Sequence, residues 1–431
     1  APPCAVRGDG YSAAMDGTQP TPGAARHDVD VDAPWRRTAA AAGLLGDAGP
    51  VPTVFETMTG LAVEHGAVNL GQGFPDADGP DALLRLAADA VLAGPNQYAP
   101  GTGDPALRQA VAEHRRRHWG VTEDPATQVM ITTGATEGIA ATVLAFVRPG
   151  DEVVTVEPFY DSHAATIALA GGRHVSVPVE APDFLPDPAR VADAITDRTR
   201  LLIVNTPHNP TGAVYPRELL EELVALCRSR GVLILADEVY DHLVYEGEHV
   251  SLRSVAGAED IALTVSSAGK AFAVTGWKVG WLTGPAELVG AARAVKQFLT
   301  YSSGPAFQRA LGAYLPTDDA ERHLAGQRER YRDARDRLVA GLREAGLDPV
   351  VPAAGYFVVV DLAPWGVTDA AEAAVRWTRE AGVTGIPVGA LCRPDGGHLR
   401  SWLRLAFCKS PDAIDEAMRR LAEAAPRLRA A

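Results

Sequence analysis

Short apolar runs alternate with helical stretches along most of this chain, and this alternation limits the folds open to it. From about residue 80, runs rich in Val, Ile and Leu recur with room for a helix between them. Strands that are apolar on both faces and separated by helices are typical of a mostly parallel sheet. The sequence therefore predicts an α/β fold with helices on both faces of a seven-stranded sheet. The expected strands are 129–133, 152–157, 174–179, 201–205, 232–237, 261–266 and 279–283.

The chain also divides into segments of different character. Residues 1–49 are rich in Ala, Gly, Pro and Asp without periodicity, which predicts a disordered extension or a tail that wraps a partner subunit, with a short helix starting near Trp35. Residues 81–315 form the expected large domain. Residues 316–431, with a long charged helix, a strand and a last helix from 411 to 428, predict a smaller α+β domain, which we expect residues 50–80 to join.

Size and charge narrow the classes of function. A chain of 431 residues is long enough for two domains. A net charge of −14 disfavours nucleic acid and anionic lipid as partners. Because there is neither a run of 18 apolar residues nor a secretory signal, we expect a cytoplasmic protein without a membrane span. The four cysteines lack the paired spacing of a zinc or redox site, so we expect reduced thiols and predict no metal site.

Polar residues stand where several of the expected strands end. In parallel sheets, ligands bind beyond the carboxyl ends of the strands. Strand 201–205 leads into Asn205-Thr206-Pro207-His208-Asn209-Pro210-Thr211-Gly212, a turn that can point two Asn side chains inward. Strand 232–237 ends in Asp237-Glu238-Val239-Tyr240. A carboxylate after an apolar strand needs a cation, for which a protonated ring nitrogen is one candidate, although Asp237 can equally cap a helix.

Two lysines and a glycine-rich turn complete this set. Lys270 follows Ser266-Ser267-Ala268-Gly269, and Lys278 stands eight residues later. An amine with a lowered pKa among other cations is suited to condense with an aldehyde, whereas an isolated lysine is usually a solvated surface residue. Ser267 and Lys278 are candidates for binding a phosphate. Gly134-Ala135-Thr136-Glu137 opens an expected helix, whose N–H groups suit the same anion or simply allow close packing.

Together these motifs resemble the class I and II aminotransferases, enzymes of the fold-type I pyridoxal-phosphate group. Asn-Pro-Thr-Gly, Asp-x-x-Tyr and Ser-x-x-Lys occur in the family's order, and the resemblance runs from about Pro50 to the C-terminus. It implies that Lys270 carries pyridoxal 5′-phosphate as a Schiff base and shuttles the proton in catalysis. It further implies cofactor contacts from Asp237 to the ring nitrogen, from Asn209 and Tyr240 to the phenolic oxygen, from Tyr160 to the ring face, and from Ala135, Thr136, Ser267 and Lys278 to the phosphate.

The resemblance also implies contacts to the substrate and to a second subunit. Arg404 matches the arginine that binds the substrate α-carboxylate, and Asn209 and Gly73 are expected beside it. Tyr98 resembles the tyrosine that reaches the phosphate across a dimer interface, and Tyr301 is expected to line the side-chain pocket of the neighbouring subunit. A homodimer with shared active sites follows. Small amino acids and 2-oxo acids are the implied ligands, with nucleic acid and membrane excluded.

Within the family, the chain is similar to two groups of enzymes. Gly276-Trp277-Lys278 and Asn69-Leu70-Gly71-Gln72-Gly73-Phe74-Pro75 resemble the kynurenine, glutamine and methionine aminotransferases, and the stretch 72–76 with Cys408-Lys409 resembles the succinyldiaminopimelate aminotransferases. Dicarboxylate-specific relatives place a partner arginine where this chain reads Ser303-Gly304-Pro305, so aspartate is not the expected donor. N-succinyl-L,L-diaminopimelate with 2-oxoglutarate, in a ping-pong reaction, is one expectation, and a broad aminotransferase is the other.

Other classes of function fit less well. A pyridoxal-phosphate β-lyase acting on cysteine S-conjugates stays open, because the same carbanion can eliminate a β-substituent. A nucleotide enzyme is disfavoured, since Gly101-Thr102-Gly103 does not follow a strand. A regulatory protein that keeps the fold normally carries a DNA-binding module, which residues 1–49 do not resemble.

Overall fold

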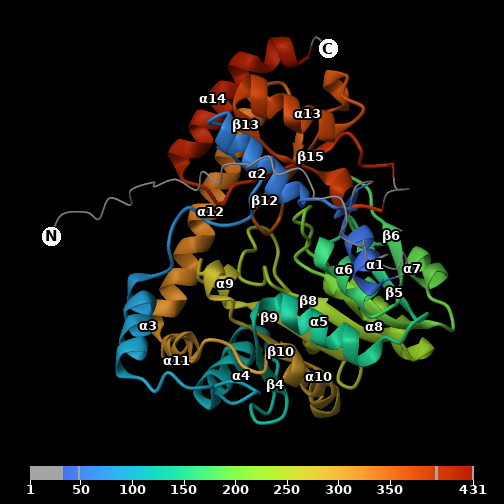
Figure 1. Ribbon diagram of the computed structural model, residues 1–431, viewed down its shortest axis with the longest axis vertical. Helices are drawn as coiled ribbons and strands as arrows, with labels where there is room; N and C mark the ends of the chain where they lie inside the picture. Colours follow the sequence, from blue (N-terminus) through green and yellow to red (C-terminus); the bar gives the residue numbers. More distant parts are fainter. Residues whose placement is uncertain (1–32, 47–48, 394–396, 430–431) are drawn as a thin grey trace, which may run out of the picture. The chain divides into compact units, whose positions relative to one another are not determined.

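A seven-stranded sheet forms the centre of the computed structural model, which describes residues 33–46, 49–393 and 397–429 (Figure 1). The strand order is β4-β10-β9-β8-β7-β5-β6, and β10 alone runs antiparallel to its neighbours. The predicted mostly parallel sheet is therefore confirmed. Its strands are β4 (Val129–Thr132), β5 (Glu152–Glu157), β6 (Arg173–Pro178), β7 (Thr199–Asn205), β8 (Leu233–Asp237), β9 (Ala262–Ser267) and β10 (Gly280–Thr283).

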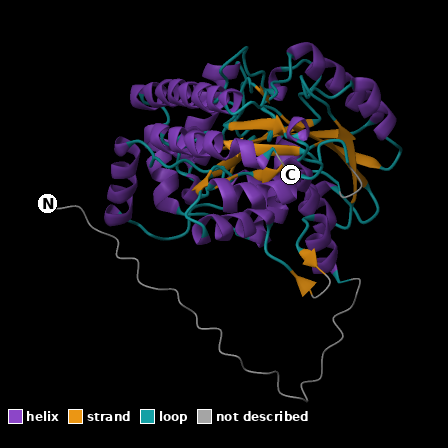
Figure 2. Ribbon diagram, turned by 90° about the horizontal axis from the view of Figure 1, so that it is seen from above, coloured by secondary structure: helices purple, strands orange, loops and turns teal. Residues whose placement is uncertain are grey.

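Helices cover both faces of this sheet (Figure 2). Because side chains alternate along a strand, Leu201 and Ile203 of β7 pack toward one face, and Leu202 and Val204 pack toward the other. The first face is covered by α5 (Gly134–Phe146), α6 (Asp161–Leu169) and α10 (Ala286–Leu299), and the second by α7 (Pro188–Ala194) and α8 (Arg217–Arg230). The sheet is thus buried on both faces, as its apolar strands require.

A further group of helices packs at the β4 end of the sheet. Ile131 of β4 and Trp281 of β10 share a core with α3 (Asp81–Ala93), α4 (Pro105–Trp119) and α11 (Pro305–Tyr314). Asp104 caps the start of helix α4 by accepting a hydrogen bond from the N–H of Ala106 at 2.8 Å, and Gly120 caps its end in the left-handed conformation. These two caps determine where α4 begins and ends.

A second, antiparallel sheet is built mainly by the C-terminal part of the chain. Its order is β11-β12-β15-β14, with β11 (Pro349–Val350), β12 (Phe357–Asp361), β15 (Trp402–Ala406) and β14 (Ile386–Pro387). One core joins it to α2 (Val54–Glu64), α12 (Asp318–Glu344), α13 (Ala370–Arg376) and α14 (Pro411–Leu428). Strand β3 (Val68–Asn69) pairs with β13 (Val383–Thr384). Residues 54–69 therefore pack with the C-terminal elements, although they precede the large sheet in the sequence.

The segment before residue 50 is partly helical. Helix α1 (Pro34–Ala41) packs against α6, and β1 (Leu45–Gly46) pairs with β2 (Gly49–Pro50). The rest of the extension predicted for residues 1–49, namely 1–32 and 47–48, lies outside the described residues. Short helical turns complete the described chain: α9 (Ala268–Ala271), η1 (Leu252–Ser254), η2 (Thr275–Trp277), η3 (Ala363–Trp365), η4 (Trp377–Ala381) and η5 (Val388–Leu391).

Two properties of the described residues bear on the predicted class of protein. Cys227, Cys392 and Cys408 are buried free thiols, whereas Cys4 lies outside the described residues. None of the helices between residues 33 and 429 that the structure describes combines the length and the apolar character that crossing a membrane requires.

Candidate active site

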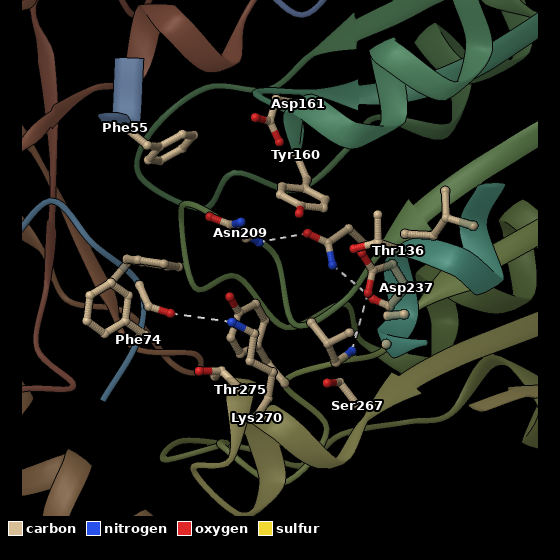
Figure 3. Close-up of a pocket in the computed structure, with 18 of the residues that line it drawn as sticks. Phe55, Phe74, Thr136, Tyr160, Asp161, Asn209, Asp237, Ser267, Lys270 and Thr275 are labelled. Atoms are coloured by element: carbon tan, nitrogen blue, oxygen red, sulfur yellow. Dashed lines mark hydrogen bonds between the residues drawn. The ribbon is translucent and has the colours of Figure 1, made fainter. Parts of the chain in front are cut away.

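The topology of the large sheet gathers the predicted functional residues at one edge. Strands β4, β7, β8 and β9 run in the same direction, so their carboxyl ends meet there. Antiparallel β10 begins at this edge, and Lys278 therefore reaches it from just before the strand. A cavity of about 320 Å³ lies at this edge (Figure 3).

Most of the predicted site residues line this one cavity. They are Gly73, Ala135, Thr136, Tyr160, Asn209, Asp237, Tyr240, Ser267, Lys270, Lys278 and Arg404. Tyr98 and Tyr301 do not line it: Tyr98 is 83% exposed, and the two rings contact each other edge to face, with centroids 5.5 Å apart. A single chain therefore brings together every predicted group except the two tyrosines assigned to a neighbouring subunit.

Lys270 projects into the cavity from α9, directly after β9. Its Nζ atom donates a hydrogen bond to the phenol oxygen of Tyr356 at 2.6 Å and lies 3.4 Å from the carbonyl oxygen of Gly73. Restricted access of water lowers the pKa of the Lys270 amine to about 8, and the nearby cations Arg404 and Lys278 act in the same direction. At neutral to mildly alkaline pH a useful fraction of this amine is therefore uncharged and nucleophilic.

Asp237 is buried at the end of β8, with 3% of its surface exposed. One carboxylate oxygen lies 3.3 Å from Nε2 of His163 on α6, and the other is 3.4 Å from the N–H of Val239. The Asp237 carbonyl accepts a hydrogen bond from the side chain of Asn205 at 2.9 Å. The contact to Val239 is too long for a strong cap, so the carboxylate keeps acceptor capacity toward the cavity.

The turn between β4 and α5 forms an anion-binding corner. Gly134 has a φ of +70°, and a Cβ there would lie 3.3 Å from Nζ of Lys278. Gly280, at the start of β10, allows equally close packing, because a Cβ would lie 2.8 Å from the backbone nitrogen of Ala135. The two glycines bring Lys278 against the first turn of α5, whose N–H groups have no partner within the helix.

Arg404 reaches the cavity from β15 of the second sheet. It is 3% exposed, and its guanidinium donates to the side-chain oxygen of Asn209 at 3.1 Å and to the carbonyl of Gly71 at 3.0 Å. The ring of Phe357 lies 4.0 Å from the guanidinium carbon. Within the described residues, the buried Nε of Arg404 has no hydrogen-bond partner. Burial lowers its pKa to about 10, so this cation is favourably placed for an anionic ligand.

Several cavity residues were not among the sequence predictions. Phe55, Phe74 and Phe357 supply apolar walls, while Asp161 and Thr275 add polar groups. Figure 3 shows Tyr160 and Asp161 on the side of the cavity opposite Lys270 and Ser267. Burial raises the pKa of Asp161. The aromatic walls come from segments far apart in the sequence, and only Phe74 stood within a motif that sequence analysis had singled out.

Tyr356 and His163 were missed as well. Tyr356 contacts Lys270, and His163 contacts Asp237. Burial raises the pKa of Tyr356 well above its usual value, so its phenol stays protonated and donates to the Gly73 carbonyl at 2.5 Å. His163 lies two residues after Asp161 in the first turn of α6, but a lone histidine gives no sequence signal of its own.

Comparison with known proteins gives a consistent picture. The family model described as aminotransferase class I and II matches residues 66–421. A protein of Mycobacterium tuberculosis named a probable N-succinyldiaminopimelate aminotransferase is 45% identical over 386 residues, covering 87% of this chain and 96% of that protein. The methionine aminotransferase of Escherichia coli is 38% identical over 371 residues, covering 86% and 95%.

Solved structures agree with these sequence matches. The structure of N-succinyldiaminopimelate aminotransferase from Mycobacterium tuberculosis superimposes with a TM-score of 0.84 at 45% identity, covering 86% of this chain and 97% of that one.

Proposed function

The chain belongs to the class I and II aminotransferases, and from this membership we propose that it binds pyridoxal 5′-phosphate in the cavity and transfers an amino group from an amino acid to a 2-oxo acid. The observation that carries the proposal is one cavity containing an amine of lowered pKa, a buried carboxylate and a buried arginine: Lys270, Asp237 and Arg404. These three groups suit an aldehyde, a protonated ring nitrogen and a carboxylate.

The residues present fit this cofactor. The corner formed by the start of α5, Ser267 and Lys278 suits a phosphate dianion, since it combines helix N–H groups, a hydroxyl and a cation. Asp237 would hold the ring nitrogen, while Asn209 and Tyr240 would bind the phenolic oxygen and Tyr160 the ring face. Lys270 is the residue to which the cofactor would be attached as a Schiff base.

When bound, pyridoxal phosphate supplies an electron sink for negative charge at the α-carbon of the amino acid. Lys270 then acts as the general base and acid, because an amine with a pKa of about 8 can take a proton from the α-carbon and return it. The Tyr356 phenol accepts a hydrogen bond from the Lys270 amine at 2.6 Å and so restricts its position. The buried setting of Asp237, 3% exposed, excludes water from the carboxylate.

Arg404 would bind the α-carboxylate of each substrate. Its two terminal nitrogens are oriented by Asn209 and Gly71, and the Phe357 ring lies against the guanidinium. A planar guanidinium held in this way can form a bidentate pair with a carboxylate. Gly73 lies on the same side of the cavity, where a Cβ would lie 2.6 Å from the Phe357 ring, so a larger residue at 73 would crowd the carboxylate site.

We further propose that the protein acts as a cytoplasmic homodimer in which Tyr98 and Tyr301 complete the partner's site. Two exposed apolar segments support this: Leu92 and Phe298 are 85% and 89% exposed, and the contact between Tyr98 and Tyr301 joins their segments. Large apolar side chains exposed to this degree are consistent with burial against a second subunit. We also propose that residues 81–315 form the large domain, and that residues 50–80 with 316–431 form the small one.

For the amino donor we propose N-succinyl-L,L-diaminopimelate, on the strength of the 45% identity to the Mycobacterium tuberculosis relative. The test is a panel in which purified enzyme with pyridoxal phosphate receives this compound, kynurenine, methionine or glutamine as donor and 2-oxoglutarate as acceptor. A dominant kcat/KM with the succinylated donor supports the proposal. Preference for another donor identifies a broad aminotransferase, and release of pyruvate and ammonia from a β-substituted donor identifies a lyase.

A further inference from the structure

Three histidines lie close together outside the cavity lining. His114 and His118 are four residues apart on α4 and therefore project from one face of the helix. His242 stands two residues beyond Tyr240, in the segment that follows β8. The Nε2 atoms of His114 and His242 form a hydrogen bond at 2.7 Å, and one ring nitrogen from each of the three residues lies within 4.8 Å of the other two.

The burial of these rings suits a bound metal ion. His114 is 3% exposed, and its Nδ1 has no hydrogen-bond partner among the described residues. Imidazole nitrogens are common ligands of zinc and other transition metals.

The distances between the histidine nitrogens are close to those around a bound zinc ion. Zinc binds histidine nitrogens at about 2.0–2.1 Å in tetrahedral geometry, which places the ligand atoms roughly 3.3 Å from one another. The observed separations, from 2.7 Å to at most 4.8 Å, bracket that value. Modest rotation of the three side chains would therefore complete three corners of a tetrahedron.

A carboxylate stands at the open side of the cluster. Oε1 of Glu321, in the first turn of α12, lies 3.2 Å from Nε2 of His118, whose side chain is 24% exposed. It can serve as the fourth ligand, or it can orient the His118 ring from outside. Solvent reaches the cluster from this side, which gives a metal ion a route of entry.

Arg328 also acts on His242 electrostatically, but two of the arginines nearby have a carboxylate partner. Arg117 pairs with Glu321 at 3.0 Å, and Arg115 pairs with Glu123 at 2.9 Å. The competing interpretation is an aromatic packing cluster, since Trp119 lies 5.1 Å from the ring of His242. Aromatic packing and the hydrogen bond between His114 and His242 do not, however, require a ring nitrogen of His118 to lie within 4.8 Å of both.

We propose that His114, His118 and His242 bind one divalent transition-metal ion of the zinc type, with Glu321 at its open side. The ion would join α4, the segment after β8 and the start of α12. Because its ligands lie outside the cavity lining, its role would be structural. The sequence prediction of no metal site rested on the spacing of the cysteines. The ligands proposed here are histidines, which that criterion does not consider.

The test uses the holoenzyme after treatment with a chelator and titration with Zn²⁺ by calorimetry. We expect one tight equivalent per chain. His118→Ala should reduce the affinity by more than the roughly 10- to 100-fold that loss of an outer partner causes. Because His118 is partly exposed, this variant should fold, and unchanged amino-transfer activity is the check. His65→Ala, at a histidine outside the cluster whose side chain is 32% exposed, is the matched control.

X-ray absorption at the zinc edge gives a second measurement. Three nitrogen neighbours at about 2.0–2.1 Å are expected in the wild type and should be lost in His118→Ala, together with the zinc-dependent rise in Tm. Absence of tight binding overturns the proposal. So does tight binding that survives unchanged in both His118→Ala and His242→Gln, because the ion would then sit elsewhere.

Discussion

The amine nitrogen of Lys270 lies 2.6 Å from the phenol oxygen of Tyr356, which itself donates to the carbonyl of Gly73 at 2.5 Å. This chain of hydrogen bonds links the helical turn after β9 to the residue just before β12 and to the segment before α3. The reactive amine is therefore positioned by segments that lie before and after it in the sequence, in surroundings that lower its pKa.

The pH dependence of cofactor attachment should report this pKa. Below about pH 8 the Lys270 amine is protonated and cannot attack an aldehyde, whereas above it the amine is free. When pyridoxal phosphate is added to cofactor-free protein, the rate of the absorbance change should rise through pH 8 and level off near pH 9. A rate that climbed steadily toward pH 10.5 would contradict the lowered pKa.

Covalent trapping should identify the attachment site. The sequence has four lysines: Lys270, Lys278, Lys296 and Lys409. After borohydride reduction of the holoenzyme, peptide mapping should find the cofactor on Lys270 alone. Lys270→Ala should lose at least about 10²–10⁴-fold in turnover, because both the anchor and the general base are removed. Trapping at Lys278 instead would reverse the roles we propose for the two lysines.

Arg404→Lys should weaken both half-reactions. The lysine keeps the positive charge but cannot form the bidentate pair, and Asn209 and Gly71 lose their donors. Loss of a buried, hydrogen-bonded charge contact costs about 2–5 kcal/mol, which corresponds to at least roughly a 30-fold fall in kcat/KM for amino donor and acceptor alike. Steady-state kinetics with each substrate varied in turn measure this fall in kcat/KM. Arg419→Ala, on the surface of α14, is the control and should change neither constant.

Complementation between inactive variants should test the shared active site. Tyr98→Ala and Lys270→Ala each disable a different contribution to one site, so a mixed dimer contains one intact site. After equal mixing and subunit exchange, about a quarter of wild-type activity should return, since half of the dimers are mixed and each has one working site. If the mixture is no more active than its components, Tyr98 does not serve the neighbouring subunit.

A buried ion network behind the site should dominate the stability of α4. Arg115 pairs with Glu123 at 2.9 Å and lies 3.6 Å from Glu238, and all three side chains are fully buried. Arg115→Ala removes the nearest cation from two buried carboxylates, leaving Glu123 with Arg253 at 3.6 Å, and should lower the free energy of unfolding by about 3–5 kcal/mol. Chemical denaturation measures the change. The neighbouring Arg116→Ala, which removes an exposed pair with Glu113, should leave the midpoint unchanged.

Local signals in the sequence predicted much of the fold. The last helix begins and ends at the predicted residues 411 and 428, because Ser410 caps it and Pro411 suits its first turn. The gathering of Asp237, Ser267 and Lys278 followed from the rule that strand ends share an edge. Such features depend on residues close in sequence or on the topology of one sheet.

Contacts between distant segments could not be predicted from the sequence. Tyr356 contacts Lys270 although the two are 86 residues apart in the sequence, and His163 contacts Asp237 at a separation of 74 residues. The spacing of His114 and His118 was visible as a one-turn repeat, but His242 joins them from 128 residues along the chain. Only packing of the second sheet and the helices brings these pairs together, and no local pattern encodes it.

Because Arg404 lies on β15, near the C-terminus, the ribosome adds it to the growing chain after the other residues of the site. The groups assigned to the cofactor lie between Tyr98 and Lys278, so a growing chain contains all of them long before Arg404 is made. A nascent chain could thus acquire the reactive lysine before it can hold a substrate carboxylate. Ribosome-bound chains that end near residue 315 would carry the nucleophile without the arginine that selects its substrates.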